Sequence, residues 1–288
     1  MNAERIKALP LTKAQALEYA QIAVRQKLGK PAEKVRYLCG GSFGRAVSVL
    51  CKDGQTLVVK FLLAEDMMQK EVHDLELLAG YSPVRVPRVF FARPGDEKIP
   101  VDCYGMEEIK GKSSLFALGM LFLGKRSRRE FADRVTTALH AIHSCKRDTF
   151  GDTMDAGCER WLDYYRPFAE GVLKKAEEYF EAGKLKKKVI LGNIMVGKGY
   201  RITGFIDPLN SAYADREYDL FQFDNLTGKR FFLRETYLRK YGASRYCMPK
   251  LAFYGLWNEV FCYIRSGVYV GFIMDPLVKN LNKRLKEL

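Results

Sequence analysis

The chain of 288 residues has little of what marks disulfide-rich, zinc-binding or membrane proteins. Its 7 cysteines are odd in number and never spaced as Cys-x-x-Cys, which excludes a disulfide scaffold and offers no zinc pattern. No run approaches the ~18 apolar residues that cross a bilayer, and residues 1–7 lack the apolar segment of a signal peptide. We therefore expect a cytoplasmic protein with reduced thiols and no membrane contact.

Acidic residues are also scarce relative to basic ones, 34 against 48, so the net charge is +14. The 48% share of hydrophobic residues is that of a globular protein and excludes disorder. Such a charge suits a nucleic acid, an anionic lipid surface or a phosphorylated substrate, and equally a role in solubility. The basic clusters, such as 125–129 and 184–188, contain no interleaved aromatic residues, so they fit a solvated face better than a base-stacking surface. We therefore do not expect a nucleic-acid partner.

The spacing of apolar residues changes character near residue 110. Residues 1–109 predict a small nucleotide-binding lobe of mixed elements, and residues 110–288 predict a larger helical lobe with one small hairpin. The helices are expected at 13–28, 66–79, 113–123, 130–144, 161–181 and, with interruptions, 215–288. The strands are expected within 35–61 and at 84–92, 101–109, 194–196 and 202–206. The fold class is therefore α+β, with two lobes and an antiparallel sheet in the first.

A glycine-rich segment, Gly40-Gly41-Ser42-Phe43-Gly44, separates two of the predicted strands. Glycines let backbone N–H groups approach phosphate oxygens, although a tight hairpin turn fits the same residues. Lys60 lies in an apolar strand beyond this loop, where a buried ammonium needs an anionic partner. Phosphates together with Glu71, from the next predicted helix, would supply it. The alternative is an edge-strand lysine that points to water.

Asn193 and Asp207 stand on the two sides of the predicted hairpin. An amide oxygen and a carboxylate that converge there suit Mg²⁺, which prefers oxygen ligands and is commonly shared with substrate phosphates. Asn in a turn and Asp before proline are also common structural residues. His140 and His143 share one side of a predicted helix, but no nearby third ligand completes a metal site, so we expect them at the edge of the core.

These parts follow one another in the order of a kinase-type phosphotransferase, with residues 106–109 as the linker between the lobes. Over about residues 35–240 the sequence resembles the aminoglycoside phosphotransferase and fructosamine (ketosamine) kinase family, the small-molecule branch of the protein-kinase-like fold. The most specific stretches are 192–196, 204–208 and 214–220. The last of these, Ala-Asp-Arg-Glu-Tyr-Asp-Leu, is similar to the Asp-Arg-Glu-x-Asp-Leu signature of the fructosamine kinase branch.

The resemblance implies an ATP- and Mg²⁺-dependent transfer of phosphate to a hydroxyl of a small molecule, of the amino-sugar, ketosamine or amino-alcohol type. It implies that the glycine loop covers the nucleotide phosphates, that Lys60 holds the α- and β-phosphates, and that the linker backbone binds adenine. The nucleotide-binding residues would be Gly40, Gly41, Ser42, Gly44, Lys60, Glu71, Glu108 and Ile109. Asn193 and Asp207 would be the Mg²⁺ ligands, and Asp215 and Asp219 would have structural roles.

The chain departs from the family at the catalytic base. The family places a His-Gly-Asp triplet just before the metal-binding asparagine, but this chain has Lys188 at the position of the aspartate and no carboxylate between Glu181 and Asp207. A charged lysine cannot accept the proton of the acceptor hydroxyl, so the catalytic residue is unknown. One explanation is a nucleotide-binding pseudokinase that acts as an interaction protein. The other, which we favour because the Lys, Glu, Asn and Asp positions all survive, is a segment missing between Val189 and Gly192.

Intact-mass measurement of the expressed protein separates these two explanations. If a segment is missing, the measured mass is expected to exceed that of the 288 residues. A mass that matches the 288 residues would remove the missing-segment explanation.

Overall fold

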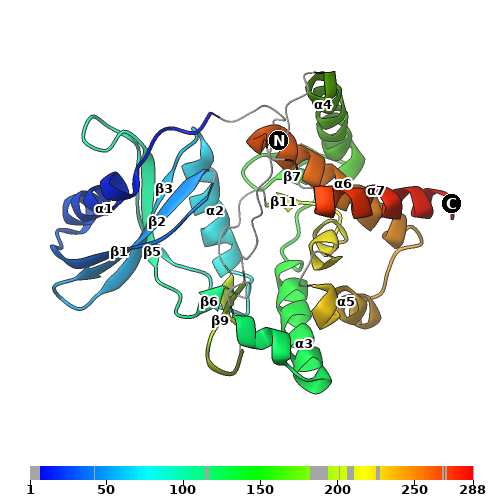
Figure 1. The fold of residues 1–288 in the computed structure, drawn as a ribbon, viewed down its shortest axis with the longest axis horizontal. Coiled ribbons are helices and arrows are strands. Elements are labelled where there is room, and N and C mark those ends of the chain that lie inside the picture. Colours follow the sequence, from blue (N-terminus) through cyan, green and yellow to red (C-terminus); the bar gives the residue numbers. More distant parts are fainter. Residues whose placement is uncertain are drawn as a thin grey trace.

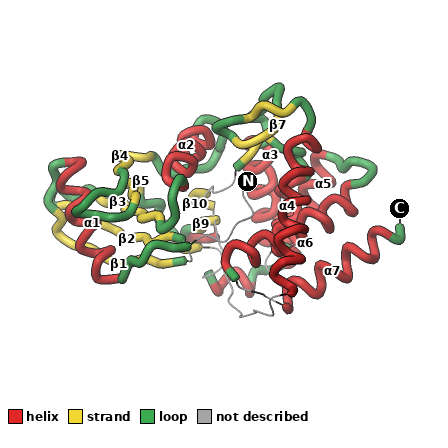
Figure 2. Tube along the Cα trace, turned by 90° about the horizontal axis from the view of Figure 1, so that it is seen from above, coloured by secondary structure: helices red, strands yellow, loops and turns green. Residues whose placement is uncertain are grey.

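The structure, a computed structural model, describes residues 7–41, 43–113, 117–181, 194–200, 202–205, 211–224, 228–267, 269 and 271–287. These residues form a sheet lobe and a helical lobe that lie side by side (Figure 1). Seen from above in Figure 2, the larger strands gather in one lobe and most of the helices in the other. The α+β class and the two lobes expected from the sequence are therefore confirmed.

The sheet lobe contains a five-stranded antiparallel sheet in the order β1-β2-β3-β5-β4. Its strands are β1 (Ala32–Gly40), β2 (Gly44–Cys51), β3 (Thr56–Leu62), β4 (Val89–Arg93) and β5 (Asp102–Glu107). Helix α1 (Lys13–Leu28) packs on one face and α2 (Met67–Ala79) on the other. Leu57, Val59 and Phe61 of β3 lie in the core beneath α1, so the residues between them face α2 because side chains alternate along a strand.

The helical lobe is built from five α-helices in the described part of the chain, joined by short 3-10 turns and two small sheets. The α-helices are α3 (Lys125–Ile142), α4 (Trp161–Glu181), α5 (Leu233–Tyr241), α6 (Cys247–Ser266) and α7 (Gly271–Leu285). The 3-10 turns are η2 (Leu118–Phe122), η3 (Lys198–Tyr200), η4 (Tyr218–Asp224) and η5 (Lys229–Phe231). The sheets are β10-β9-β6 and β11-β7-β8, from β6 (Lys112–Ser113), β7 (Phe150–Asp152), β8 (Ala156–Cys158), β9 (Ile194–Val196), β10 (Ile202–Phe205) and β11 (Ala212–Tyr213).

Local sequence signals set several of these bounds. Helix α1 has the predicted range because Thr12 and Gln15 form a capping box and Gly29 ends the helix at a left-handed φ of 67°. Strand β4 begins at Val89 rather than at residue 84, and the proline at position 87, which has no backbone N–H to donate to a ladder, precedes it. Helix α3 begins at Lys125, earlier than predicted, directly after Gly124. Among the described residues, no helix has the length and apolar character needed to cross a membrane.

One close contact in the sheet gives a test of the packing. Gly105 of β5 pairs with Phe91 of β4, and a Cβ atom at Gly105 would lie 2.2 Å from the Phe91 ring. Gly105→Ala is therefore expected to lower the free energy of unfolding by about 1–3 kcal/mol, because the ring must move. The matched control is Gly157→Ala in β8, where a new Cβ would meet nothing within 4 Å. Urea unfolding measures both variants, and equal stabilities would contradict the packing described.

Candidate active site

An ion pair between Lys60 and Glu71 lies between the sheet and α2. Lys60 occupies one of the positions of β3 that face α2, and its Nζ donates a hydrogen bond to Oε1 of Glu71. The Glu71 side chain is 1% exposed and that of Lys60 16% exposed. At this depth each charge needs the other, because their attraction offsets part of the desolvation cost and the loss of either would leave a buried charge without a partner. The alternative of a lysine that points to water does not hold in this structure.

The glycine loop between β1 and β2 is tied down at its base. The amide of Gly41 donates to the carbonyl of Gly44 at 3.0 Å, and the Arg45 guanidinium donates to both the Gly41 and the Gly44 carbonyls, at 2.6 and 2.8 Å. A Cβ on Gly44 would lie 3.5 Å from Cε of Lys60, so the loop base and the lysine are neighbours. Of the predicted glycines, Gly44 thus lies next to the ion pair, Gly41 is hydrogen-bonded to Gly44, and Gly40 pairs with Arg45 in the β1–β2 ladder. Ser42 lies outside the described residues.

The tip of this loop also meets the helical lobe. The guanidinium carbon of Arg265, near the end of α6, lies 5.9 Å from the centre of the Phe43 ring and 5.1 Å from that of Phe261. Burial lowers the pKa of Arg265. In Figure 1 the end of α6 is the part of that helix nearest the sheet lobe. The loop, the lysine and α6 therefore line the junction of the lobes.

The linker between the lobes leaves the sheet at β5. Glu107 pairs with Leu57 in the last rung between β5 and β3, so the main chain of Glu108 and Ile109 continues beyond this ladder. The Glu108 carboxylate accepts a hydrogen bond from Ser48 at 3.0 Å and lies 3.6 Å from Arg36. The Glu108 side chain is therefore held toward the sheet. The main chain of the linker carries N–H and C=O groups, and these groups are suited to recognise the edge of a base.

The predicted metal ligands, Asn193 and Asp207, lie outside the described residues, as does the segment around Lys188. The hairpin predicted between the two ligands is present, because β9 and β10 pair antiparallel with Ile194 opposite Phe205. Strand β9 also pairs with β6, which follows the linker. The hairpin is thus next to the junction of the lobes. Among the residues described here, no group of three or more His, Cys, Asp and Glu side chains could hold a metal.

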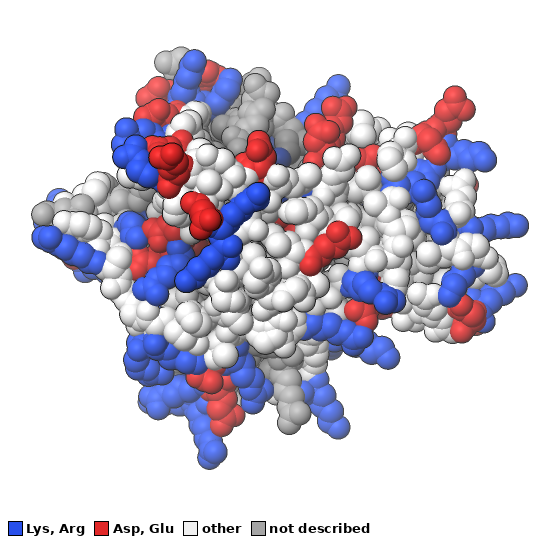
Figure 3. Space-filling view, turned by 180° about the vertical axis from the view of Figure 1, so that it is seen from behind, with Lys and Arg blue, Asp and Glu red and all other residues white. Residues whose placement is uncertain are grey.

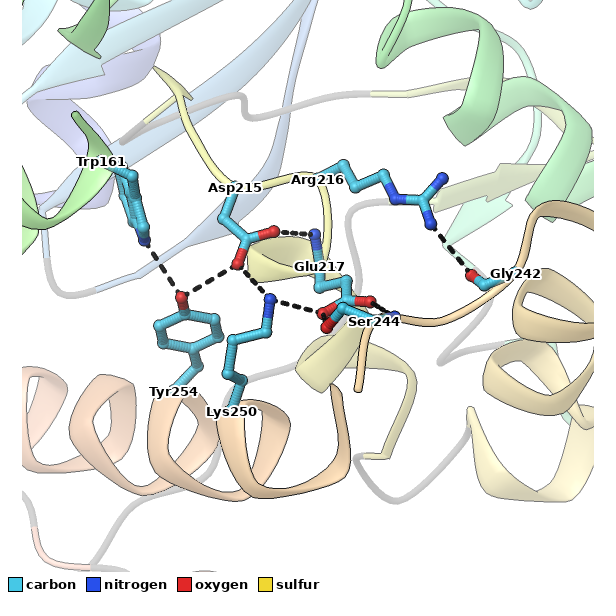
Figure 4. A network of polar contacts seen from close by, with 8 residues as sticks. All are labelled: Trp161, Asp215, Arg216, Glu217, Gly242, Ser244, Lys250 and Tyr254. Carbon is cyan, nitrogen blue, oxygen red and sulfur yellow. Dashed lines mark hydrogen bonds and ion pairs between the residues drawn. The ribbon is translucent and has the colours of Figure 1, made fainter. Parts of the chain in front are cut away.

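The Asp-Arg-Glu-Tyr-Asp-Leu stretch is the centre of a polar network in the helical lobe (Figure 4). Asp215 accepts hydrogen bonds from Lys250 at 2.6 Å and from the Tyr254 hydroxyl at 3.3 Å. The indole of Trp161 donates to that hydroxyl at 3.0 Å. Asp215, in the loop before η4, is therefore connected to α6 and, through Tyr254, to α4. Its contacts are structural, and its ion-pair partner is Lys250 rather than Arg216.

Glu217, in the same stretch, is 1% exposed and also pairs with Lys250, at 2.6 Å. It accepts further hydrogen bonds from the amide and the hydroxyl of Ser244, both at 2.7 Å. Burial by itself would raise the pKa of Glu217, but the hydrogen bonds from Lys250 and Ser244 outweigh it and lower the pKa to about 2. The carboxylate is therefore ionised at neutral pH and fixes the start of α6.

Asp219 and two histidines at the end of α3, His140 within the helix and His143 directly after it, extend this support. His143 shares a hydrogen bond of 2.8 Å with the Tyr237 hydroxyl, and its other ring nitrogen lies 3.4 Å from Asp219. The His140 ring stacks on Tyr241 with centres 3.7 Å apart. Both histidines thus pack between α3 and α5. Sequence reasoning missed Lys250, although a lysine within an apolar helix is the same signal that singled out Lys60.

The sheet, the linker and the helical lobe define the two-lobed protein-kinase-like fold. Solved structures of similar fold include a protein assigned as a fructosamine-3-kinase from Thermobifida fusca, with a TM-score of 0.62 and 15% identity over 92% of this chain and 98% of that one. A second is aminoglycoside 2′-phosphotransferase-IIIa with GDP, with a TM-score of 0.62 and 13% identity over 94% of this chain and 99% of that one. A third is a macrolide 2′-phosphotransferase from Brachybacterium faecium, with a TM-score of 0.58 and 15% identity over 91% of this chain and 98% of that one. No family model and no curated protein sequence matches the chain. These similarities confirm the expected fold. The three proteins are kinases and phosphotransferases of small molecules, the kind of protein that the sequence resembles.

The Glu217 network predicts a dependence of stability on pH. Because the pKa of Glu217 in the folded state, about 2, lies below its ordinary value of 4.5, its contribution is complete above pH 4.5 and is lost as pH falls toward 2. Glu217→Gln is expected to lower the free energy of unfolding by about 3 kcal/mol at neutral pH, because Lys250 loses one of its two carboxylate partners. It should also flatten the fall in melting temperature between pH 4.5 and 2.

The matched control is Glu235→Gln. That glutamate pairs with Arg234 at 2.8 Å but its side chain is 51% exposed, so it should change stability by well under about 1 kcal/mol. Thermal unfolding across pH measures both variants. A Glu217→Gln protein with the stability and the acid profile of the parent would contradict the role assigned to this carboxylate.

Proposed function

We propose that the protein is an ATP- and Mg²⁺-dependent phosphotransferase that acts on a hydroxyl of a small molecule. The observation that carries the proposal is the Lys60 and Glu71 ion pair directly beside the base of the glycine loop. In phosphoryl transfer the protein contributes mainly position and charge neutralisation, and a fixed cation below a phosphate-covering loop supplies both. The solved phosphotransferases of the same fold support this reaction class.

The residues act on the nucleotide from three sides. Lys60 would neutralise the α- and β-phosphates while Glu71 keeps its ammonium in place. Gly40, Gly41, Ser42 and Gly44 would let the main chain approach the phosphates from above. The main chain of Glu108 and Ile109 would receive the edge of the base. Together these contacts would hold the terminal phosphate at the junction of the lobes, where the acceptor hydroxyl can reach it.

Asn193 and Asp207 would hold the magnesium ion. An amide oxygen and a carboxylate are a donor set that fits Mg²⁺, and the described hairpin of β9 and β10 lies between these two positions. When bound, the ion would supply charge neutralisation on the phosphates. The residues of this chain would fix where that charge sits.

The acceptor is proposed to be an amino sugar, a ketosamine or an amino alcohol. The net charge of +14 disfavours a polycationic aminoglycoside among these, because such a substrate needs an acidic pocket. In Figure 3 Lys and Arg side chains are spread over both lobes with Asp and Glu between them, and on this face they do not form one continuous basic patch. A ketosamine, whose charge is smaller, is therefore the acceptor we place first.

A second function remains for one specific reason, the absence of a carboxylate between Glu181 and Asp207. Without a base for the acceptor hydroxyl, the same nucleotide site would serve a pseudokinase that binds ATP and acts through protein contacts. Nucleotide binding is common to both functions, and only turnover with an acceptor separates them.

The test measures binding first and turnover second. Mg-ATP is expected to bind, and Lys60→Met should weaken binding about 10- to 100-fold, because one charge-assisted contact to the phosphates is lost. Lys34→Met, an exposed lysine of β1, is the matched control and should leave the affinity unchanged. GTP is compared with ATP, because a protein of the same fold holds GDP.

Turnover is then followed as ADP release in the presence of ketosamines, amino sugars and amino alcohols. Acceptor-dependent release that is lost in Lys60→Met supports the phosphotransferase. Binding without release on any acceptor, in a chain of verified mass, leaves the pseudokinase. Parent protein that binds neither nucleotide would overturn both functions.

A further inference from the structure

A second buried polar cluster joins α2 to the helical lobe. Lys70 of α2 contacts the Asp74 carboxylate one turn further on, the Thr153 hydroxyl at 2.6 Å and the Ser211 carbonyl at 2.9 Å. The Thr153 hydroxyl donates in turn to Asp74. We call these four residues, Lys70, Asp74, Thr153 and Ser211, the interlobe clamp. Thr153 lies between β7 and β8 and Ser211 just before β11, so the clamp reaches the β11-β7-β8 sheet.

The clamp is buried and charge-balanced. Asp74 is 0% exposed and Thr153 6% exposed, and the Lys70 side chain is 13% exposed. Burial raises the pKa of Asp74, against the hydrogen bonds from Lys70 and Thr153. Asp152 lies 3.7 Å from Lys70 and adds a second carboxylate at the rim. A buried network of this kind holds one geometry, because any rearrangement leaves a charge without a partner.

The position of the clamp on α2 relates it directly to Glu71. Lys70 and Asp74 share one side of the helix, and Glu71 and Leu75 share the neighbouring side, because successive residues are turned by about 100°. Leu75 packs into the core beneath the sheet and Glu71 meets Lys60 there. Figure 1 draws α2 on the side of the sheet that faces the helical lobe. A rotation of α2 that moved Lys70 away from Thr153 would therefore also turn Glu71 away from Lys60.

The ends of α2 do little to fix the helix. Asp66 precedes it with a φ of 59° in the left-handed region and makes no side-chain capping bond. Gly80 follows it in a helical conformation rather than as a left-handed stop. In the described part of the chain, the rotation of α2 is thus set by its packing on the sheet, by the Glu71 and Lys60 pair and by the clamp.

We propose that the interlobe clamp is a positioning device that keeps α2 in the rotation at which Glu71 meets Lys60. The proposal rests on the proposed function, because the purpose of the Lys60 and Glu71 pair is to receive nucleotide phosphates. It makes Lys70, Asp74 and Thr153 positioning residues that act on the nucleotide through Glu71.

The test is a double-mutant cycle on nucleotide affinity. Thr153→Val keeps the shape of the side chain and removes its hydroxyl, and it is made in the parent and in Glu71→Gln. In the parent we expect Mg-ATP to bind about tenfold more weakly, in line with the loss of a hydrogen bond to charged groups. In Glu71→Gln, Thr153→Val should cause no further loss, because the residue through which it acts is already neutral.

The matched control is Thr136→Val, another buried threonine, whose hydroxyl hydrogen-bonds within α3, to the carbonyls of Ala132 and Asp133. It should change stability without changing nucleotide affinity. Hydrogen exchange of the α2 amides, residues 67–79, is the second readout and needs no nucleotide. It should quicken in Thr153→Val and stay at the parent rate in Thr136→Val.

The outcomes separate the two proposals. Equal losses of affinity from Thr153→Val in the parent and in Glu71→Gln would show that it does not act through Glu71, and would overturn the clamp as a positioning device. Unchanged exchange in α2 would overturn it as well. Parent protein that binds no nucleotide would overturn the proposed function instead, while the exchange measurement would still decide whether the clamp holds α2.

Discussion

The burial of one lysine is the constraint on which the rest of the candidate site depends. Lys60 sits on an apolar strand, and an ammonium there is stable only beside a carboxylate. That carboxylate, Glu71, comes from a helix that has to be docked on the sheet with the correct rotation. Apolar packing supplies attraction but no direction, because the hydrophobic effect is not directional. The direction comes from hydrogen bonds that Lys70 and Asp74 form with the other lobe, so the geometry of a site on the sheet is set partly by the helical lobe.

The same solution recurs deeper in the helical lobe. Lys250 lies between the carboxylates of Asp215 and Glu217, and each carboxylate accepts a further hydrogen bond from the chain around it. These contacts join α4, η4 and α6, three elements whose apolar faces also meet in an aromatic core. In both places the charged residues select one arrangement among several that apolar packing alone would allow. The contacts of the motif that resembles the fructosamine kinase branch therefore support the helical lobe.

Local pattern predicted several local parts of this fold, but the helix expected at 113–123 was wrong, because strand β6 (Lys112–Ser113) and the 3-10 turn η2 (Leu118–Phe122) lie there. The range of α1 followed from apolar spacing and a capping threonine, and Lys60 stood out because a charge interrupts an apolar strand. Strands β7 and β11, of three and two residues, were missed because segments so short show no alternation. The clamp was missed for a different reason. Lys70 meets a hydroxyl 83 residues away and a carbonyl 141 residues away, and neither partner differs locally from an ordinary loop residue.

The cost of the Lys60 and Glu71 pair is itself an argument about ligand chemistry. Apolar residues of similar volume could fill the same space between β3 and α2, and replacing buried ion pairs in that way is often neutral or stabilising. A fold that needed only packing would therefore have no use for charges at these two positions. The ammonium of Lys60 is held by a carboxylate, and Cε of the same side chain lies 3.5 Å from the position that a Cβ would take at Gly44. Such a cation has a use when an anion enters below the glycine loop. The buried pair therefore supports our proposal that the sheet lobe receives phosphate groups, with its cation in position before the ligand arrives.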